Sequence, residues 1–201
     1  IRMMGGIIPP TSGNIIIGGL DMARNPVAAK MMIGFVPDRP FLYEKLTGME
    51  FLRFSADLYR VPPEYFPQKA EQLLRLFALW DWADELIEAY SHGMKQRLII
   101  ASALLHDPRI LIIDEPMVGL DPAAVHMVKD IFKELARKQT TIFISTHTLS
   151  IAEDLCHRIG VIHKGMLLAE GNVNELRSIA KLGTAALEEV FLTLIKEDTF
   201  L

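Results

Sequence analysis

Two acidic residues directly follow an apolar run and could carry chemistry. Residues 109–116 read Arg-Ile-Leu-Ile-Ile-Asp-Glu-Pro, so Asp114 and Glu115 come at the end of a predicted buried strand. Ligands of open parallel sheets bind at the carboxyl ends of the strands. Phosphoryl transfer needs one carboxylate to hold Mg²⁺ and a second group to orient the attacking water, and this pair could supply both. The alternative is a strand-to-helix turn in which Asp114 is only a cap.

Two other segments carry polar groups that could bind a phosphate. Ser91 and Gly93 lie in a small polar turn that leads into a helix, where a hydroxyl and backbone N–H groups meet the positive end of the helix dipole. The alternative for Ser91 is a simple helix cap. His147 follows the predicted strand 140–145, and a lone histidine there is more often structural. If the two strands are neighbours, however, His147 emerges at the same edge as Asp114 and Glu115.

The elements that would position these residues alternate along the second half of the chain. Strands are expected at 109–113 and 140–145 and helices at 93–105 and 122–138, the latter opened by Asp121 and a proline. This alternation predicts an α/β fold with a parallel sheet and helical crossovers. Beyond it we expect a helix at 149–156 and a hairpin at 158–170.

The first half of the chain is expected to be more helical. Thr47 and Glu50 form a capping-box pattern that starts a helix at about 48–59, and a second helix is expected at about 64–79. The opening residues are expected to finish a helix, and residues 14–17 to form a short strand.

Composition excludes several classes of protein. The 201 residues are 50% hydrophobic and carry a formal net charge of −4, which argues against a disordered chain and against a nucleic-acid-binding protein. The single cysteine, Cys156, cannot form an internal disulfide, which favours a reducing compartment. Mean hydropathy is +0.24, but no apolar run approaches the roughly 20 residues that span a bilayer.

Taken in order, these motifs resemble those of ABC-type ATPase domains. YSHGMKQR (90–97) is similar to the signature motif, LIIDEP (111–116) to the Walker B strand with its catalytic glutamate, VGLD (118–121) to the D-loop and STH (145–147) to the H-loop. The resemblance implies a P-loop NTPase-like parallel sheet with a helical signature subdomain. It also implies a single partial domain over 1–201, with the subdomain at 48–92 and a C-terminal helical extension at 172–201.

The resemblance further implies a role for each motif residue. Asp114 would hold Mg²⁺, Glu115 would polarise the attacking water and His147 would contact the γ-phosphate of ATP. Ser91 and Gly93 of one subunit would close over the nucleotide held by a second ATP-binding subunit in a head-to-tail dimer. Asp121 would link the two sites across that dimer.

Two departures from the family pattern limit these expectations. No Gly-Lys pair exists in the sequence, so the phosphate loop is absent together with the strands before it, and the chain alone is expected to be inactive. Asp38 stands where the family has the Q-loop glutamine. Its carboxylate can offer Mg²⁺ or its water an oxygen but cannot donate a hydrogen bond, and the alternative is that Asp38 merely begins an exposed turn.

The whole protein is therefore expected to work at the cytoplasmic face of the cell membrane. By resemblance it is the ATP-hydrolysing subunit of a transporter, in the form used by bacterial exporters, and its partner is a separate transmembrane permease subunit. Two alternatives remain open. One is a soluble ABC-type ATPase that acts on DNA or ribosomes, and the other is a fragment that does not hydrolyse ATP.

Overall fold

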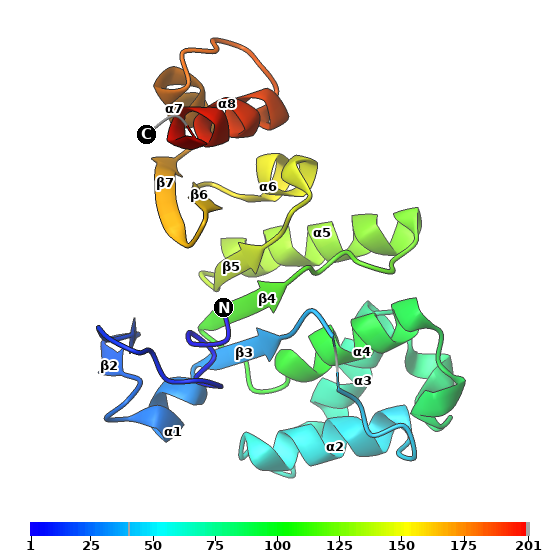
Figure 1. The fold of residues 1–201 in the computed structure, drawn as a ribbon. Coiled ribbons are helices and arrows are strands. Elements are labelled where there is room, and N and C mark those ends of the chain that lie inside the picture. The colour runs from blue at the N-terminus through cyan, green and yellow to red at the C-terminus, as the bar shows by residue number, and fades with distance from the viewer. Residues whose placement is uncertain (40, 200–201) are drawn as a thin grey trace. The chain divides into compact units, whose positions relative to one another are not determined.

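The computed structural model describes residues 1–39 and 41–199, which fall into two compact units (Figure 1). The first unit comprises residues 1–145 and the second the described part of residues 146–201. The predicted extension 172–201 therefore includes two residues, 200 and 201, that lie outside the described residues. In the described part of the chain, no helix combines the length and the apolar character needed to cross a bilayer.

The core of the first unit, as far as the unit is described, is a parallel sheet of three strands. Its order is β3 (Ile33–Val36), β4 (Ile110–Asp114) and β5 (Thr141–Ser145), with Val36 paired to Ile113 and Asp114 to Ser145. The side chains in the middle of β4 are fully buried, as expected for a central strand covered on both faces. The predicted parallel sheet is confirmed.

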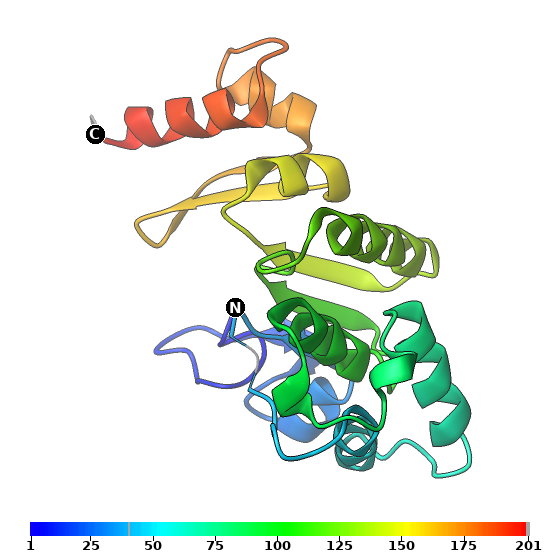
Figure 2. The same ribbon diagram turned by 90° about the vertical axis from the view of Figure 1, so that its right-hand side faces the viewer.

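Helices make the crossovers between these strands. α4 (His92–Ala103) leads into β4 and packs against β3, whereas α5 (Pro122–Arg137) joins β4 to β5 and packs against β5 (Figure 2). Asp121 caps α5, since its Oδ1 accepts a hydrogen bond of 2.8 Å from the Ala124 amide. Proline follows at the first helical position, where its missing N–H costs nothing.

A group of short helices lies between β3 and α4. It contains α2 (Gly48–Leu58), α3 (Phe66–Leu76), η1 (Trp80–Trp82) and η2 (Ile87–Ala89). The capping box at the start of α2 is confirmed: Glu50 N–H donates to Thr47 Oγ1 at 3.1 Å, and Thr47 N–H donates to Glu50 Oε2 at 2.8 Å. We call residues 48–89 the helical segment.

The beginning of the chain differs from its prediction. Residues 1–8 form turns, with one α-type hydrogen bond from Gly5 N–H to the Ile1 oxygen, so the expected helix was wrong. Gly6 follows with a positive φ of 65°, a conformation that suits glycine and does not continue a right-handed helix. The predicted strand at 14–17 pairs, as β1 (Ile16–Ile17), with an unforeseen β2 (Leu20–Asp21), and α1 (Pro26–Lys30) precedes β3.

The second unit is a hairpin with three helices. α6 (Leu149–Leu155) precedes β6 (Ile159–His163) and β7 (Met166–Gly171), and α7 (Val173–Ile179) and α8 (Leu187–Thr199) follow. The turn residues Lys164 and Gly165 both have positive φ, which matches the right-handed twist of an antiparallel pair. The apolar core of this unit includes Val161, Leu176 and Val190.

Candidate functional site

Asp114 and Glu115 leave the sheet at the carboxyl end of the central strand. The Glu115 amide donates to the Ser145 carbonyl oxygen at 2.9 Å, so the backbone pairing with β5 extends one residue beyond β4. Glu115 itself has a φ of +49°, a left-handed conformation that costs a non-glycine residue free energy. The side chains of both acidic residues are partly buried. The chain thus turns sharply directly after β4 and holds two carboxylates at the sheet edge.

Ser91 begins α4 and caps it. Its Oγ accepts a hydrogen bond of 3.2 Å from the Met94 amide, and its carbonyl accepts one of 2.9 Å from the Lys95 amide. The capping interpretation of Ser91 is therefore confirmed, and it is compatible with a phosphate site. Ser91 remains exposed, and the amides of His92 and Gly93 head the helix, where the dipole favours an anion.

The turn after β4 packs directly on this helix start. Gly119 has a φ of +77°, and a Cβ atom at this position would lie 1.9 Å from Cδ2 of His92. A Cβ on Gly93 would lie 3.3 Å from the Gly119 carbonyl oxygen. The backbone of residues 118–121 therefore fits closely against the beginning of α4 because both glycines lack side chains. The structure in this way brings Ser91, Gly93 and the turn that ends at Asp121 together.

Two residues missed by the sequence analysis fix the same helix to its surroundings. Gln96 is 2% exposed and its Nε2 donates to the Pro116 carbonyl at 3.5 Å. Arg97 donates from Nη1 to the Phe77 carbonyl at 2.6 Å and to the Ala78 carbonyl at 3.4 Å, at the end of α3. Burial lowers the pKa of Arg97, and the charge of Asp121 partly opposes that shift. An arginine still keeps its charge there.

The other two predicted site residues, Asp38 and His147, come from other segments of the chain. Asp38 is exposed and comes shortly after β3, whose carboxyl end is level with that of β4 because Val36 pairs with Ile113. It therefore lies at the same sheet edge as Asp114. His147 belongs to the second compact unit, so its predicted place beside Glu115 stays a prediction.

The carboxylates of Asp114 and Glu115 can supply only some of the ligands that a Mg²⁺ ion needs. In the chain as far as it is described, no three His, Cys, Asp or Glu residues cluster in a way that could hold a metal ion. Protein sites for Mg²⁺ that work on phosphates commonly supply one or two carboxylates and leave the other positions to water and phosphate oxygens. Asp114 at the sheet edge fits that requirement, with Glu115 beside it.

The fold and these motifs define a class of protein. The family model for ABC transporters matches residues 1–118, and the chain belongs to this family as an ATP-binding domain. The predicted fold class and family are confirmed.

Individual relatives support the same assignment. The chain is 35% identical to the linearmycin resistance ATP-binding protein LnrL of Bacillus subtilis over 98% of this chain and 65% of that protein. It is 34% identical to the ABC-type transporter ATP-binding protein EcsA of the same organism, over 98% of this chain and 80% of EcsA. The chain is thus shorter than both relatives.

Solved structures agree with the fold. A structure described as the ATP-binding subunit of an ABC transporter superposes with a TM-score of 0.91 at 34% identity, covering 96% of this chain and 81% of its own. The dimeric ATP-binding cassette MJ0796, bound to ADP and Pi, superposes with a TM-score of 0.76 at 24% identity, covering 86% of this chain and 78% of its own.

Proposed function

We propose that this chain is part of the ATP-hydrolysing subunit of an ABC transporter, which couples MgATP hydrolysis to transport by a separate membrane subunit. The observation that carries the proposal is the end of β4, where Asp114 and the strained Glu115 stand at the carboxyl edge of a parallel sheet. Backbone strain held at such a point is typical of functional positions. Membership of the ABC transporter family gives the class of reaction.

Each polar residue of the site then has one task. Asp114 holds Mg²⁺, which when bound neutralises charge that develops on the phosphates. Glu115 orients the attacking water, and His147 contacts the γ-phosphate. Asp38 offers an oxygen to Mg²⁺ or to a water that the ion binds.

A second copy of the subunit completes the site. Ser91 and Gly93, at the positive end of α4, bind the γ-phosphate held by the partner's phosphate loop, and Asp121 links the two sites. The close fit between residues 118–121 and the start of α4 supports this arrangement, because it would present the signature and D-loop residues as one surface. The dimeric state of the cassette MJ0796 is consistent with it.

The membrane subunit docks on the helical segment and the loop before it, at the cytoplasmic face of the membrane. Phe41, Tyr43 and Phe54 form a chain of edge-to-face rings with centroid distances of 5.7 and 5.3 Å, and Phe41 is 78% exposed. Nearby, a groove of about 670 Å³ is lined mainly by apolar groups of α2, α3 and Trp80. Exposed rings beside an apolar groove are typical of a docking surface. The form of the signature motif at residues 90–97, YSHGMKQR, favours an exporter.

The test compares ATP hydrolysis by two forms of the protein. One is this 201-residue chain, and the other is the chain extended at its amino end with a strand and phosphate loop from a relative. We expect MgATP hydrolysis only in the extended form, because no Gly-Lys phosphate-loop pair occurs in the chain.

Substitution of Glu115 supplies the control for the chemistry. Glu115→Gln keeps the size of the side chain and the backbone conformation but cannot act as a carboxylate, so it should abolish turnover in the extended form. The chain without the loop is also expected not to bind MgATP tightly, and tight binding would contradict that expectation. A folded extended protein that stays inactive, with or without a membrane partner, would contradict the proposed ATPase.

A further inference from the structure

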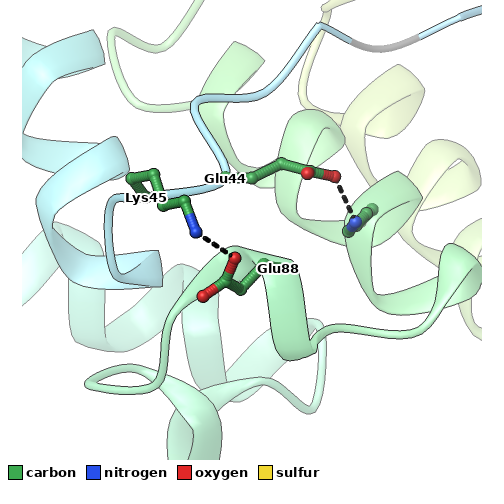
Figure 3. A network of polar contacts seen from close by, with 4 residues as sticks. Glu44, Lys45 and Glu88 are labelled. Carbon is green, nitrogen blue, oxygen red and sulfur yellow. Dashed lines mark hydrogen bonds and ion pairs between the residues drawn. The ribbon is translucent and has the colours of Figure 1, made fainter.

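Two ion pairs join the loop before α2 to other parts of the first unit (Figure 3). Lys45 Nζ lies 2.6 Å from Glu88 Oε2, and Lys95 Nζ lies 2.6 Å from Glu44 Oε1. The two pairs use adjacent residues of one loop and have the same length. They differ in exposure, because the lysine side chain is 83% exposed in the Lys45–Glu88 pair and 22% exposed in the Glu44–Lys95 pair.

The segments that they connect are different. The Lys45–Glu88 pair joins two stretches of backbone that already pair with each other: Glu88 N–H donates to the Glu44 carbonyl at 3.1 Å, and Ile87 N–H donates to the Leu46 carbonyl at 2.9 Å. The Glu44–Lys95 pair instead reaches α4, one turn beyond Ser91. The loop is thus already held by backbone hydrogen bonds, and the ion pair of Glu44 with Lys95 connects this fixed loop to α4.

Lys95 is an unfavourable residue for its own helix. It stands near the amino end of α4, where the helix dipole is positive and a cation is disfavoured. Its side chain is only 22% exposed, and the Glu44 carboxylate compensates its charge. The same contact holds the pKa of Glu44 below its ordinary value through the hydrogen bond and charge of Lys95. The negative charge of Glu44 therefore offsets the unfavourable position of the Lys95 charge near the positive end of the helix dipole.

Lys95 is also one of three consecutive residues that hold α4 in place. Lys95 contacts the loop at Glu44, Gln96 contacts the turn after β4 at Pro116, and Arg97 contacts the end of α3 at Phe77. Three contacts with three separate segments fix both the position and the rotation of the first turn. Two of them, through Gln96 and Arg97, go to backbone carbonyls, and only the first is an ion pair that salt or a change of charge can release.

We propose that Glu44 is a positioning residue, which through Lys95 holds the turn that carries Ser91 and Gly93 against the loop before α2. A movement of this loop would then shift the residues that meet the nucleotide. The consequence for catalysis rests on the proposed ATPase function, whereas the positioning itself can be measured without ATP.

Amide hydrogen exchange at the start of α4 measures the positioning. The amides of Met94 and Lys95 both bond to Ser91, so their protection reports opening of this turn. We expect Glu44→Gln to raise their exchange rates about two- to fivefold, the range that an exposed ion pair supports. The substitution changes no residue of α4, so a faster exchange cannot come from an altered helix propensity.

Three controls separate the proposal from a general effect of surface charge. Glu88→Gln breaks the other ion pair of the same loop and should leave these amides unchanged. In a Lys95→Met background, Glu44→Gln should have no further effect. In about 1 M salt, where screening acts over roughly 3 Å, the difference between Glu44→Gln and the unchanged protein should largely vanish. Unchanged exchange in Glu44→Gln, or an equal rise in Glu88→Gln, would overturn the proposal.

Turnover in the extended chain supplies a second readout. There Glu44→Gln should lower kcat/KM two- to fivefold while Glu88→Gln does not, and Glu115→Gln should abolish activity. Raised exchange in an extended chain that lacks ATPase activity would refute the proposed function and support the positioning. Unchanged exchange in Glu44→Gln together with an active extended chain would support the proposed function and refute the positioning role of Glu44.

Discussion

The contact between Gly119 and His92 predicts a defined free-energy cost for Gly119→Ala. Gly119 has a φ of +77°, which costs an L-residue about 1 kcal/mol or slightly more. The new Cβ would also lie 1.9 Å from His92 Cδ2, so the ring must move. Because His92 is exposed and can change rotamer, that displacement costs about 1 kcal/mol. We therefore expect Gly119→Ala to lower the free energy of unfolding by about 2 kcal/mol.

Urea unfolding of four matched variants tests this reasoning. Gly13→Ala is the control for backbone strain, because Gly13 has a φ of +75° in the same unit and a Cβ there would meet no atom within 4 Å. Gly13→Ala should lower the free energy of unfolding only by the cost of the strained backbone conformation, about 1 kcal/mol. Adding His92→Ala to Gly119→Ala should recover the remaining 1 kcal/mol or so, measured against His92→Ala alone. The reasoning fails if Gly119→Ala costs no more than Gly13→Ala, or if His92→Ala restores nothing.

Two further predictions concern groups that the sequence did not single out. Arg97→Met should cost about 2 kcal/mol in urea unfolding, because it removes a charged donor from the Phe77 carbonyl, and a loss below about 0.5 kcal/mol would show that water replaces the guanidinium. Burial lowers the pKa of His106, whose Nε2 lies 3.1 Å from the Ile33 carbonyl and whose Nδ1 has no partner among the described residues. At a pH between the ordinary pKa of 6.5 and the lowered pKa of His106 in the fold, the unfolded chain binds a proton that the folded chain does not. The free energy of unfolding should therefore fall as the pH drops below 6.5. His106→Phe should make the urea midpoint less dependent on pH from 7.5 to 5, and an unchanged slope would contradict this assignment.

Local patterns predicted much of the fold. The strand at β4 is a continuous apolar run, and Thr47 with Glu50 is a complete capping box, so both could be located from neighbouring residues alone. The order of the motifs was sufficient to identify the family. The wrong prediction, that the opening residues finish a helix, lay in a short segment with two glycines, where helix formation is weak.

The contacts within the site could not be predicted in the same way. His92 lies over Gly119, and Arg97 reaches the carbonyl of Phe77, 20 residues away in the sequence. Such pairs depend on which segments the fold brings together, and no spacing within one segment encodes them. The positive φ of Glu115 was also hidden, because glutamate rarely adopts it and a turn after β4 does not specify which residue takes that conformation.

The place of β5 in its sheet has a consequence for handling the protein. β5 lies at the end of the strand order in the described sheet, and residues 140–146, Thr-Thr-Ile-Phe-Ile-Ser-Thr, contain neither a charge nor a proline. Phe143, in the middle of β5, is 41% exposed. An uncharged segment rich in β-branched residues is a template for strand addition between molecules while the chain is not yet folded. We therefore expect self-association through residues 140–146 to compete with refolding, so that the yield of monomer falls as the concentration of the chain rises.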